Sequence, residues 1–244
     1  HEGFYITGSG GYQAREKSSD IGLGTAAEFQ DGFAVNGGVG YRFPFNIRAE
    51  VEASYQNNKN KAFLNEGSDL FANGVRGTHP DGSVNPGLPI GSSEPSTGNV
   101  GLRSFMVNLY YDIPLGPDSR WKPYFGGGVG VYQSTINGFT SAEMNGALRT
   151  SGIAISTSSR EAFCWQIRAG LAYRVTERAE LFGGYRYFHG DTLNFTFNVP
   201  AGALPGYSPN PATTPVPSAP GLQLPLSVTG GVTHGAEFGF RFFF

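Results

Sequence analysis

The sequence predicts an all-β fold: a closed, antiparallel, eight-stranded up-and-down β-barrel that crosses a membrane. Three observations predict it. Segments of about ten residues with alternating apolar and polar side chains recur along the chain. Charged residues make up only 15% of the sequence, against about 25% in a typical soluble domain. Short and long connections alternate between the segments, as they do between the two rims of a bacterial barrel.

The first four predicted strands are 3–12, 31–43, 47–56 and 105–113. The first is the weakest, because glycines and small polar residues interrupt its pattern. The second sets phenylalanine, valine and tyrosine on one face against asparagine, arginine and glycine on the other. The third and fourth alternate strictly. Successive side chains of a strand point to opposite faces, so each segment has one apolar face.

The last four predicted strands are 122–132, 163–175, 178–188 and 233–244. The first contains the run FGGG, whose glycines allow strands to bend and approach closely in a small barrel. The next two join through the tight corner VTER, and the last alternates phenylalanine with other residues. No helical periodicity competes with these patterns in any segment.

The connections differ between the two ends of the predicted barrel. Tight ones have the sequences FPFN, PLGPDSR and VTER. The long, polar ones are at about 14–30, 57–99, 133–160 and 189–231. Compact soluble domains seldom carry such long connections, whereas outer-membrane barrels combine short periplasmic turns with long extracellular loops. We therefore expect residues 1–244 to form one barrel domain with four extracellular loops and both termini in the periplasm.

The segment IRAEVEASYQ at 47–56 indicates which face meets lipid. Arg48, Glu50 and Glu52 alternate with apolar side chains. A register slip of one residue would place all three charges in the bilayer, at about 2–4 kcal/mol for an arginine near its midplane. We therefore expect the apolar face to meet lipid and the charged face to line the lumen.

The same alternation in every strand predicts a lumenal charge network of five cations and five anions. Its members are Arg48, Glu50, Glu52, Asp112, Arg168, Arg174, Glu180, Arg186, Glu237 and Arg241. The interior of an eight-stranded barrel is just wide enough for side chains to fill, so we expect these charges to pair. Two interpretations stay open. The network is either structural, or it is a gate in which exchange of arginine partners opens a narrow water path.

Several strands carry recognisable motifs. They are FMVNLYYDI, WKPYFGGGVGVY and WQIRAGLAYRVTERAELFGGYRYF, in that order. These resemble the eight-stranded outer-membrane barrels related to the transmembrane domain of OmpA, in particular their opacity-type, alphaproteobacterial surface-antigen branch. The resemblance covers the strands, about half of the chain, and implies a Gram-negative outer membrane with lipid and lipopolysaccharide as neighbours. The long loops match no motif of that family.

The C-terminal sequence FGFRFFF resembles the signal that the barrel-assembly machinery reads in this family. Its alternating aromatic side chains are Phe238, Phe240, Phe242 and Phe244. The resemblance therefore implies that the chain is a client of this machinery during biogenesis.

No catalytic, metal or cofactor site is predicted. His189 and Asp191 stand close together in FHGD, near His234 of the last strand, but a strand that runs into a turn explains this equally well. The motifs G-x-S-x-G and H-E-x-x-H are missing. The single cysteine, Cys164, excludes an intrachain disulfide and a multi-cysteine metal site. A net charge of −2 without any basic run argues against nucleic acid as a partner.

These observations favour a structural, non-enzymatic surface protein of a Gram-negative outer membrane. Its barrel is expected to anchor the long loops, which would contact other surfaces or neighbouring surface proteins. The alternative function is a narrow passive pore for ions or small solutes, gated by the lumenal charge network.

Overall fold

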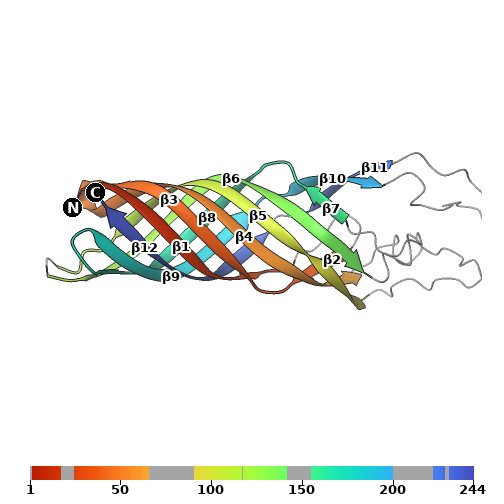
Figure 1. The fold of residues 1–244 in the computed structure, drawn as a ribbon, viewed down its shortest axis with the longest axis horizontal. Coiled ribbons are helices and arrows are strands. Elements are labelled where there is room, and N and C mark those ends of the chain that lie inside the picture. The colour runs from red at the N-terminus through yellow and green to blue at the C-terminus, as the bar shows by residue number, and fades with distance from the viewer. Residues whose placement is uncertain are drawn as a thin grey trace, which may run out of the picture.

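Eight strands form one closed antiparallel barrel in the computed structural model (Figure 1). They are β1 (Gly3–Arg15), β3 (Gly32–Arg42), β4 (Ile47–Asn65), β5 (Ser93–Asp112), β6 (Trp121–Ser141), β8 (Ala162–Arg174), β9 (Ala179–Gly190) and β12 (Val232–Phe243). Each pairs with the next along the chain, and β12 pairs with β1, which closes the sheet. The predicted eight-stranded up-and-down barrel is confirmed.

The structure describes most of the chain outside the predicted loops. The described residues are 2–17, 25–65, 91–116, 118–141, 155–199, 222–228 and 231–244. Large parts of the four predicted loops, 18–24, 66–90, 142–154 and 200–221, therefore lie outside the described residues.

Short elements accompany the barrel strands. Strand β2 (Thr25–Phe29) pairs with β4, and β7 (Ile155–Ser158) pairs with β6. Strands β10 (Leu193–Val199) and β11 (Leu222–Val228) form a separate hairpin. The helix η1 (Pro44–Asn46) is a single 3-10 turn between β3 and β4. Within the described ranges, no helix is long and apolar enough to cross a membrane.

Both chain termini lie at the same end of the barrel (Figure 1), which we call the terminal end. The tight connections β3–β4, β5–β6 and β8–β9 are at this end, in agreement with the alternation of connection lengths in the sequence. We call the opposite end, where the long connections join the strands, the loop end. The turn at η1 is sharp, since Phe45 and Asn46 both have a φ of 64°.

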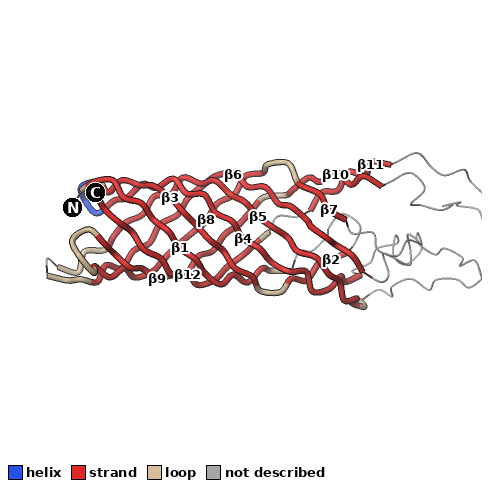
Figure 2. Tube along the Cα trace, in the orientation of Figure 1, coloured by secondary structure: helices blue, strands red, loops and turns tan. Residues whose placement is uncertain are grey.

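Three strands run much further toward the loop end than the sequence pattern predicts. Strands β4, β5 and β6 have 19, 20 and 21 residues, and Figure 2 shows strand along the whole length of the barrel. Segments 57–65, 93–99 and 133–141 are thus strand where loops were expected. A strand of about 20 residues tilted by about 45° rises roughly 45 Å, well beyond an apolar band of about 25 Å. Outside that band neither face needs to be apolar, so the alternation that marks a membrane strand fades.

The outer surface of the barrel is an apolar belt. Outward apolar side chains that are more than half exposed come from most of the barrel strands. They include Val39, Val107, Leu109, Phe125, Val129, Ile167, Leu181 and Phe240. Their neighbours in sequence point inward and are buried, as in the charged positions of β4. The apolar core of an ordinary domain is thus turned outward, which is the arrangement that a bilayer stabilises.

Candidate functional site

The lumen of the barrel is filled with charged side chains. Nine of the ten predicted network residues are buried, and Arg48 and Arg186 have no exposed surface at all. The other seven buried members are Glu50, Glu52, Asp112, Arg168, Glu180, Glu237 and Arg241. All of them occupy the inward positions of their strands, so the barrel wall itself brings them together.

The first ion-pair cluster lies at the terminal end, around Asp112 and Glu180. Asp112 is 2.9 Å from Nη2 of Arg48 and 3.1 Å from Nη2 of Arg42. Glu180 lies 3.0 Å from Arg42 and 2.8 Å from Nζ of Lys122. Nη1 of Arg241 approaches Glu180 to 3.5 Å. Each carboxylate therefore has at least two cationic partners, as buried charges require.

Two members of this cluster were missing from the predicted network. Arg42 and Lys122 both occupy inward positions near the ends of β3 and β6, and the alternation of those strands already contains this information. Lys122 is only partly buried, so its ammonium group reaches the rim while it contacts Glu180.

Arg174, by contrast, was predicted to belong to the network but forms a different contact. It lies directly across from Glu180 in the β8–β9 register. Its Nη2 nevertheless donates a hydrogen bond to the backbone carbonyl of Ser119 at 3.3 Å, in the turn before β6. At the end of a strand a long side chain can bend toward the rim, and Arg42 and Lys122 already contact Glu180. In the described contacts Arg174 thus braces a turn and is not part of the ion-pair network.

The second ion-pair cluster lies further toward the loop end, around Glu52. Its carboxylate is 2.6 Å from Nη1 of Arg168 and 3.7 Å from Nη2 of Arg186. Arg168 also approaches Glu237 to 3.5 Å. Arg186 donates hydrogen bonds to Gln166 Oε1 at 2.7 Å and to Asn36 Oδ1 at 2.9 Å. Neutral amides thus supply acceptors for the buried guanidinium group of Arg186.

Aromatic rings separate the two clusters. The guanidinium carbon of Arg48 lies 4.7 Å from the ring centroid of Tyr110, and that of Arg241 lies 4.2 Å from the ring centroid of Phe182. Tyr124 contacts Tyr110 and Phe182 edge to face, with centroid distances of 6.2 Å to each. Cation–π contacts of this kind stabilise a desolvated guanidinium. The rings and cations together obstruct the middle of the lumen.

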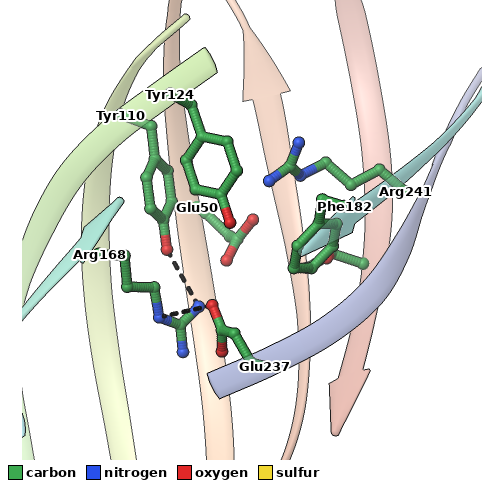
Figure 3. A pocket seen from close by; sticks show the side chains of 8 residues that line it. Glu50, Tyr110, Tyr124, Arg168, Phe182, Glu237 and Arg241 are labelled. Atoms are coloured by element: carbon green, nitrogen blue, oxygen red, sulfur yellow. Dashed lines mark hydrogen bonds and ion pairs between the residues drawn. The ribbon is translucent and has the colours of Figure 1, made fainter. Parts of the chain in front are cut away.

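A small cavity remains beside these rings (Figure 3). It is lined by Thr7, Glu50, Tyr110, Tyr124, Arg168, Phe182, Glu237 and Arg241. Its volume is about 10 Å³, which is room for about one water molecule. Glu50 accepts a hydrogen bond from Tyr5 Oη at 2.9 Å, while Tyr124 Oη has no hydrogen-bond partner in the structure. The cavity is thus polar enough for a water but too small for a solute.

An apolar cluster occupies the lumen near the loop end. Its barrel members are Leu102, Met106, Tyr132, Cys164 and Phe188, all almost fully buried. Two side chains of the β10–β11 hairpin, Leu193 and Phe195, pack into the same cluster. The fourth predicted loop therefore contains a strand that contacts the barrel interior, a signal already visible in the alternation of LNFTFNV. Cys164 lies in this apolar environment, where a thiol is unreactive.

The histidines do not form a catalytic arrangement in the described part of the chain. His189 stacks on Trp165 with ring centroids 5.2 Å apart, and His234 lies 6.1 Å from the Tyr185 ring. Asp191 is exposed, and its backbone carbonyl accepts the hydroxyl of Tyr132 at 2.5 Å. Within the described ranges, no three histidine, cysteine or acidic side chains are grouped as a metal site.

Comparison with known proteins identifies the family. Residues 1–202 match the family model described as "Outer membrane protein beta-barrel domain". This chain belongs to that family. It is an outer-membrane β-barrel protein of the Gram-negative type, which confirms the resemblance read from its strands. No curated protein matches it.

Solved structures share the fold at low identity. Neisserial surface protein A is 16% identical, with 99% of this chain and 97% of that chain covered and a TM-score of 0.52. OprG from Pseudomonas aeruginosa is 17% identical, with 100% and 98% covered and a TM-score of 0.57. The protease OmpT from Escherichia coli also matches, at 10% identity, with 99% of this chain and 97% of that chain covered and a TM-score of 0.46. Identities this low show the fold alone.

Proposed function

We propose that this protein is a structural, non-enzymatic surface protein whose filled barrel anchors its long extracellular loops for contact with other surfaces or with neighbouring surface proteins. The filled lumen is the observation that carries the proposal. Two ion-pair clusters, a layer of aromatic rings and an apolar cluster occupy successive levels of the interior. A cavity beside the aromatic rings holds about one water molecule.

The proposed orientation places the terminal end in the periplasm and the loop end outside the cell. Short turns at one end and long connections at the other support it, because outer-membrane barrels combine short periplasmic turns with longer extracellular loops. The long strands β4, β5 and β6 extend the barrel beyond the apolar band on the loop side. In this orientation they form a rigid wall that carries the loops away from the lipid surface.

The outer wall supports two further parts of the proposal. Phe238, Phe240, Phe242 and Phe244 are all exposed on the outside of β12. They are thus available to the barrel-assembly machinery as the C-terminal signal and to lipid afterwards. Arg103 is also outward and exposed, in the middle of β5 opposite Tyr55 and Gln133, and its long side chain would reach toward phosphate groups of lipopolysaccharide.

The experiment that tests the anchoring function replaces loop residues while the barrel stays intact. Segments 66–90 and 200–221, which lie outside the described residues, would each be exchanged for a short Gly/Ser linker. We expect both variants to fold, with heat-modifiable migration in gels, and to lose contact with the surfaces or cross-linked neighbours of the parent. Unchanged surface contacts in both variants would contradict the proposal. A His189→Ala variant is expected to leave lipid A unmodified, like the parent.

A passive pore is the second candidate, and one observation favours it. Arg168 lies near two carboxylates, 2.6 Å from Glu52 and 3.5 Å from Glu237, beside the water-sized cavity. Exchange between the two partners would move the guanidinium group and change the width of the path. In such a pore, Glu52→Ala would change the conductance, whereas in a plug the parent does not conduct steadily.

A further inference from the structure

One buried arginine differs from all the others in the lumen. Arg15, at the loop end of β1, is 8% exposed. The five lumenal arginines of the ion-pair clusters each lie within 4.0 Å of a carboxylate: Arg42, Arg48, Arg168, Arg186 and Arg241. Arg15 forms no such pair in the described part of the chain, and its Nε and Nη1 have no hydrogen-bond partner.

Among the described residues around Arg15, no carboxylate compensates its charge. Its guanidinium carbon lies 4.5 Å from the ring centroid of Phe29, a contact that holds the plane of the group without neutralising it. Gly231 lies against another part of the group, since a Cβ on this glycine would be only 2.9 Å from Nη2 of Arg15. A side chain at position 231 would therefore displace the guanidinium group.

Two glutamines at the same end of the lumen are also unsatisfied. Gln13 and Gln56 have no exposed surface, yet both polar atoms of Gln13 and the Nε2 of Gln56 have no hydrogen-bond partner. Thr233 links this level to Arg15: it is the partner of Arg15 in the β1–β12 register, and its hydroxyl donates to Gln56 Oε1 at 3.0 Å. Gln13 and Arg15 occupy successive inward positions of β1, so unmet N–H donors from three side chains lie in this part of the lumen, together with one unmet acceptor, Gln13 Oε1.

A buried cation without a counter-charge is costly, and a buried donor without an acceptor adds to the cost. The carboxylates lower in the lumen cannot supply the charge, because they pair or hydrogen-bond within their own clusters. A guanidinium group presents five N–H donors and no acceptor, and an amide nitrogen presents two more. The chemistry that satisfies this donor set is an oxyanion with several acceptor atoms.

We propose that Arg15, with the amide nitrogens of Gln13 and Gln56, binds one small oxyanion such as phosphate, sulfate or a carboxylate inside the loop end of the lumen. The anion enters from the loop end. Because all three side chains are buried, the site takes a free anion and not a lipid headgroup or a sulfated polymer.

The test is a titration of inorganic phosphate into the full-length refolded protein in uncharged maltoside micelles, followed by calorimetry. We expect saturable binding of one phosphate. Arg15→Gln is expected to weaken it by about tenfold or more, as loss of a hydrogen bond to a charged group does. Arg15→Lys keeps the charge and is expected to bind more tightly than Arg15→Gln. Arg103→Gln, on the outer face, is the matched control and is expected to bind like the parent.

Absence of saturable phosphate binding by the parent, or equal affinity of Arg15→Gln, would overturn the proposal. Acetate and sulfate are expected to compete with phosphate, whereas lipopolysaccharide is not. Competition by lipopolysaccharide would overturn the assignment to a free anion. If Arg15→Gln fails to fold, the backbone amide resonances of Gly231 and Thr233 in the parent decide instead. They are expected to shift on addition of phosphate, and unchanged resonances would overturn the site.

Discussion

The two halves of the lumen are built on different chemistry. Toward the terminal end, buried arginines and carboxylates pair at 2.6–3.7 Å, with aromatic rings between them. Toward the loop end the interior changes to carboxamides, an apolar cluster and Arg15, which has no ion-pair partner among the described residues. In the first half, carboxylates of the barrel itself compensate the charges of the buried arginines. The second half has an apolar cluster on one side and unmet donors on the other.

This difference follows from what surrounds each half. Where the outer face meets lipid, polar side chains have only the lumen to occupy, so charges concentrate there and pair. Where the long strands extend beyond the apolar band, both faces are in contact with water or with loops. The selection for a charged interior therefore weakens toward the loop end. Leu193 of β10 packs there on apolar side chains such as Met106, which lies between the outward Phe105 and Val107.

The largest expected effect is the loss of a shared carboxylate in the terminal-end cluster. Glu180→Ala leaves Arg42, Lys122 and Arg241 without their common partner. Breaking a buried pair in this way costs about 3–5 kcal/mol, so the free energy of unfolding is expected to fall by that amount. Urea unfolding in micelles measures it. The matched control Glu177→Ala, exposed in the next turn, is expected to change stability by no more than about 0.5 kcal/mol. Equal losses of stability in the two variants would show that the terminal-end ion-pair cluster does not stabilise the barrel.

The second largest effect is expected from charges placed on the outer face of β4, and it measures where the apolar band of the barrel ends. Val51→Arg places a charge on the lipid face opposite Val107 and is expected to cost about 2–4 kcal/mol. Asn57→Arg, on the same face of β4 but six residues closer to the loop end, is expected to cost about 0–1 kcal/mol. Unfolding in lipid bilayers compares them. A high cost at both positions would mean that the apolar band extends to Asn57.

The apolar cluster of the loop end predicts protection of the single cysteine. Cys164 has no exposed surface, so a small thiol reagent is expected to label it only after unfolding. Leu193→Ala removes a side chain that packs on the cluster and is expected to cost about 2 kcal/mol, at the low end for such a truncation, and to accelerate labelling. Mass spectrometry follows the labelling. Rapid labelling of the folded parent would show that the loop end of the lumen is open.

The smallest effect is expected for Arg174, which was predicted in the ion-pair network but lies outside it. Arg42, which was not predicted but belongs to the network, serves as the comparison. Arg174→Ala removes one hydrogen bond to a backbone carbonyl and is expected to cost about 1 kcal/mol or less. Arg42→Ala takes one cationic partner from each of two buried carboxylates, Asp112 and Glu180, and is expected to cost about 3 kcal/mol. Thermal unfolding of the two variants distinguishes these roles. A larger loss of stability for Arg174→Ala than for Arg42→Ala would show that Arg174 belongs to the lumenal charge network.

The sequence predicts the fold well because a bilayer imposes the alternation residue by residue. The inward positions of Glu52, Arg168 and Arg186 follow from that parity alone. Arg42 and Lys122 obey the same parity, so the sequence contained the information that places them in the lumen, although the predicted network omitted them. The alternation of inward and outward positions does not determine which side chain bends to the rim, so the contact of Arg174 with Ser119 is apparent only in the folded barrel.

The loop end was harder to predict for a different physical reason. Polar sequences such as NNKNKAF continue β4 by pairing with β5, and backbone pairing leaves little trace in side-chain polarity. Arg15 lies three residues past the predicted end of the first strand, so its place inside the barrel depends on that extension. Its lack of a described counter-ion is a property of packing, visible only once the surrounding strands are in place.

Single-channel conductance of the refolded protein in a planar bilayer tests most directly whether the lumen is a plug. The parent and Glu52→Ala would be recorded side by side, with the outward variant Leu109→Ala as the control. A filled, paired interior predicts silence or only rare, small openings for the parent and the control. Steady conductance of the parent that changes in Glu52→Ala would contradict this account and identify the charge network as the gate of a pore.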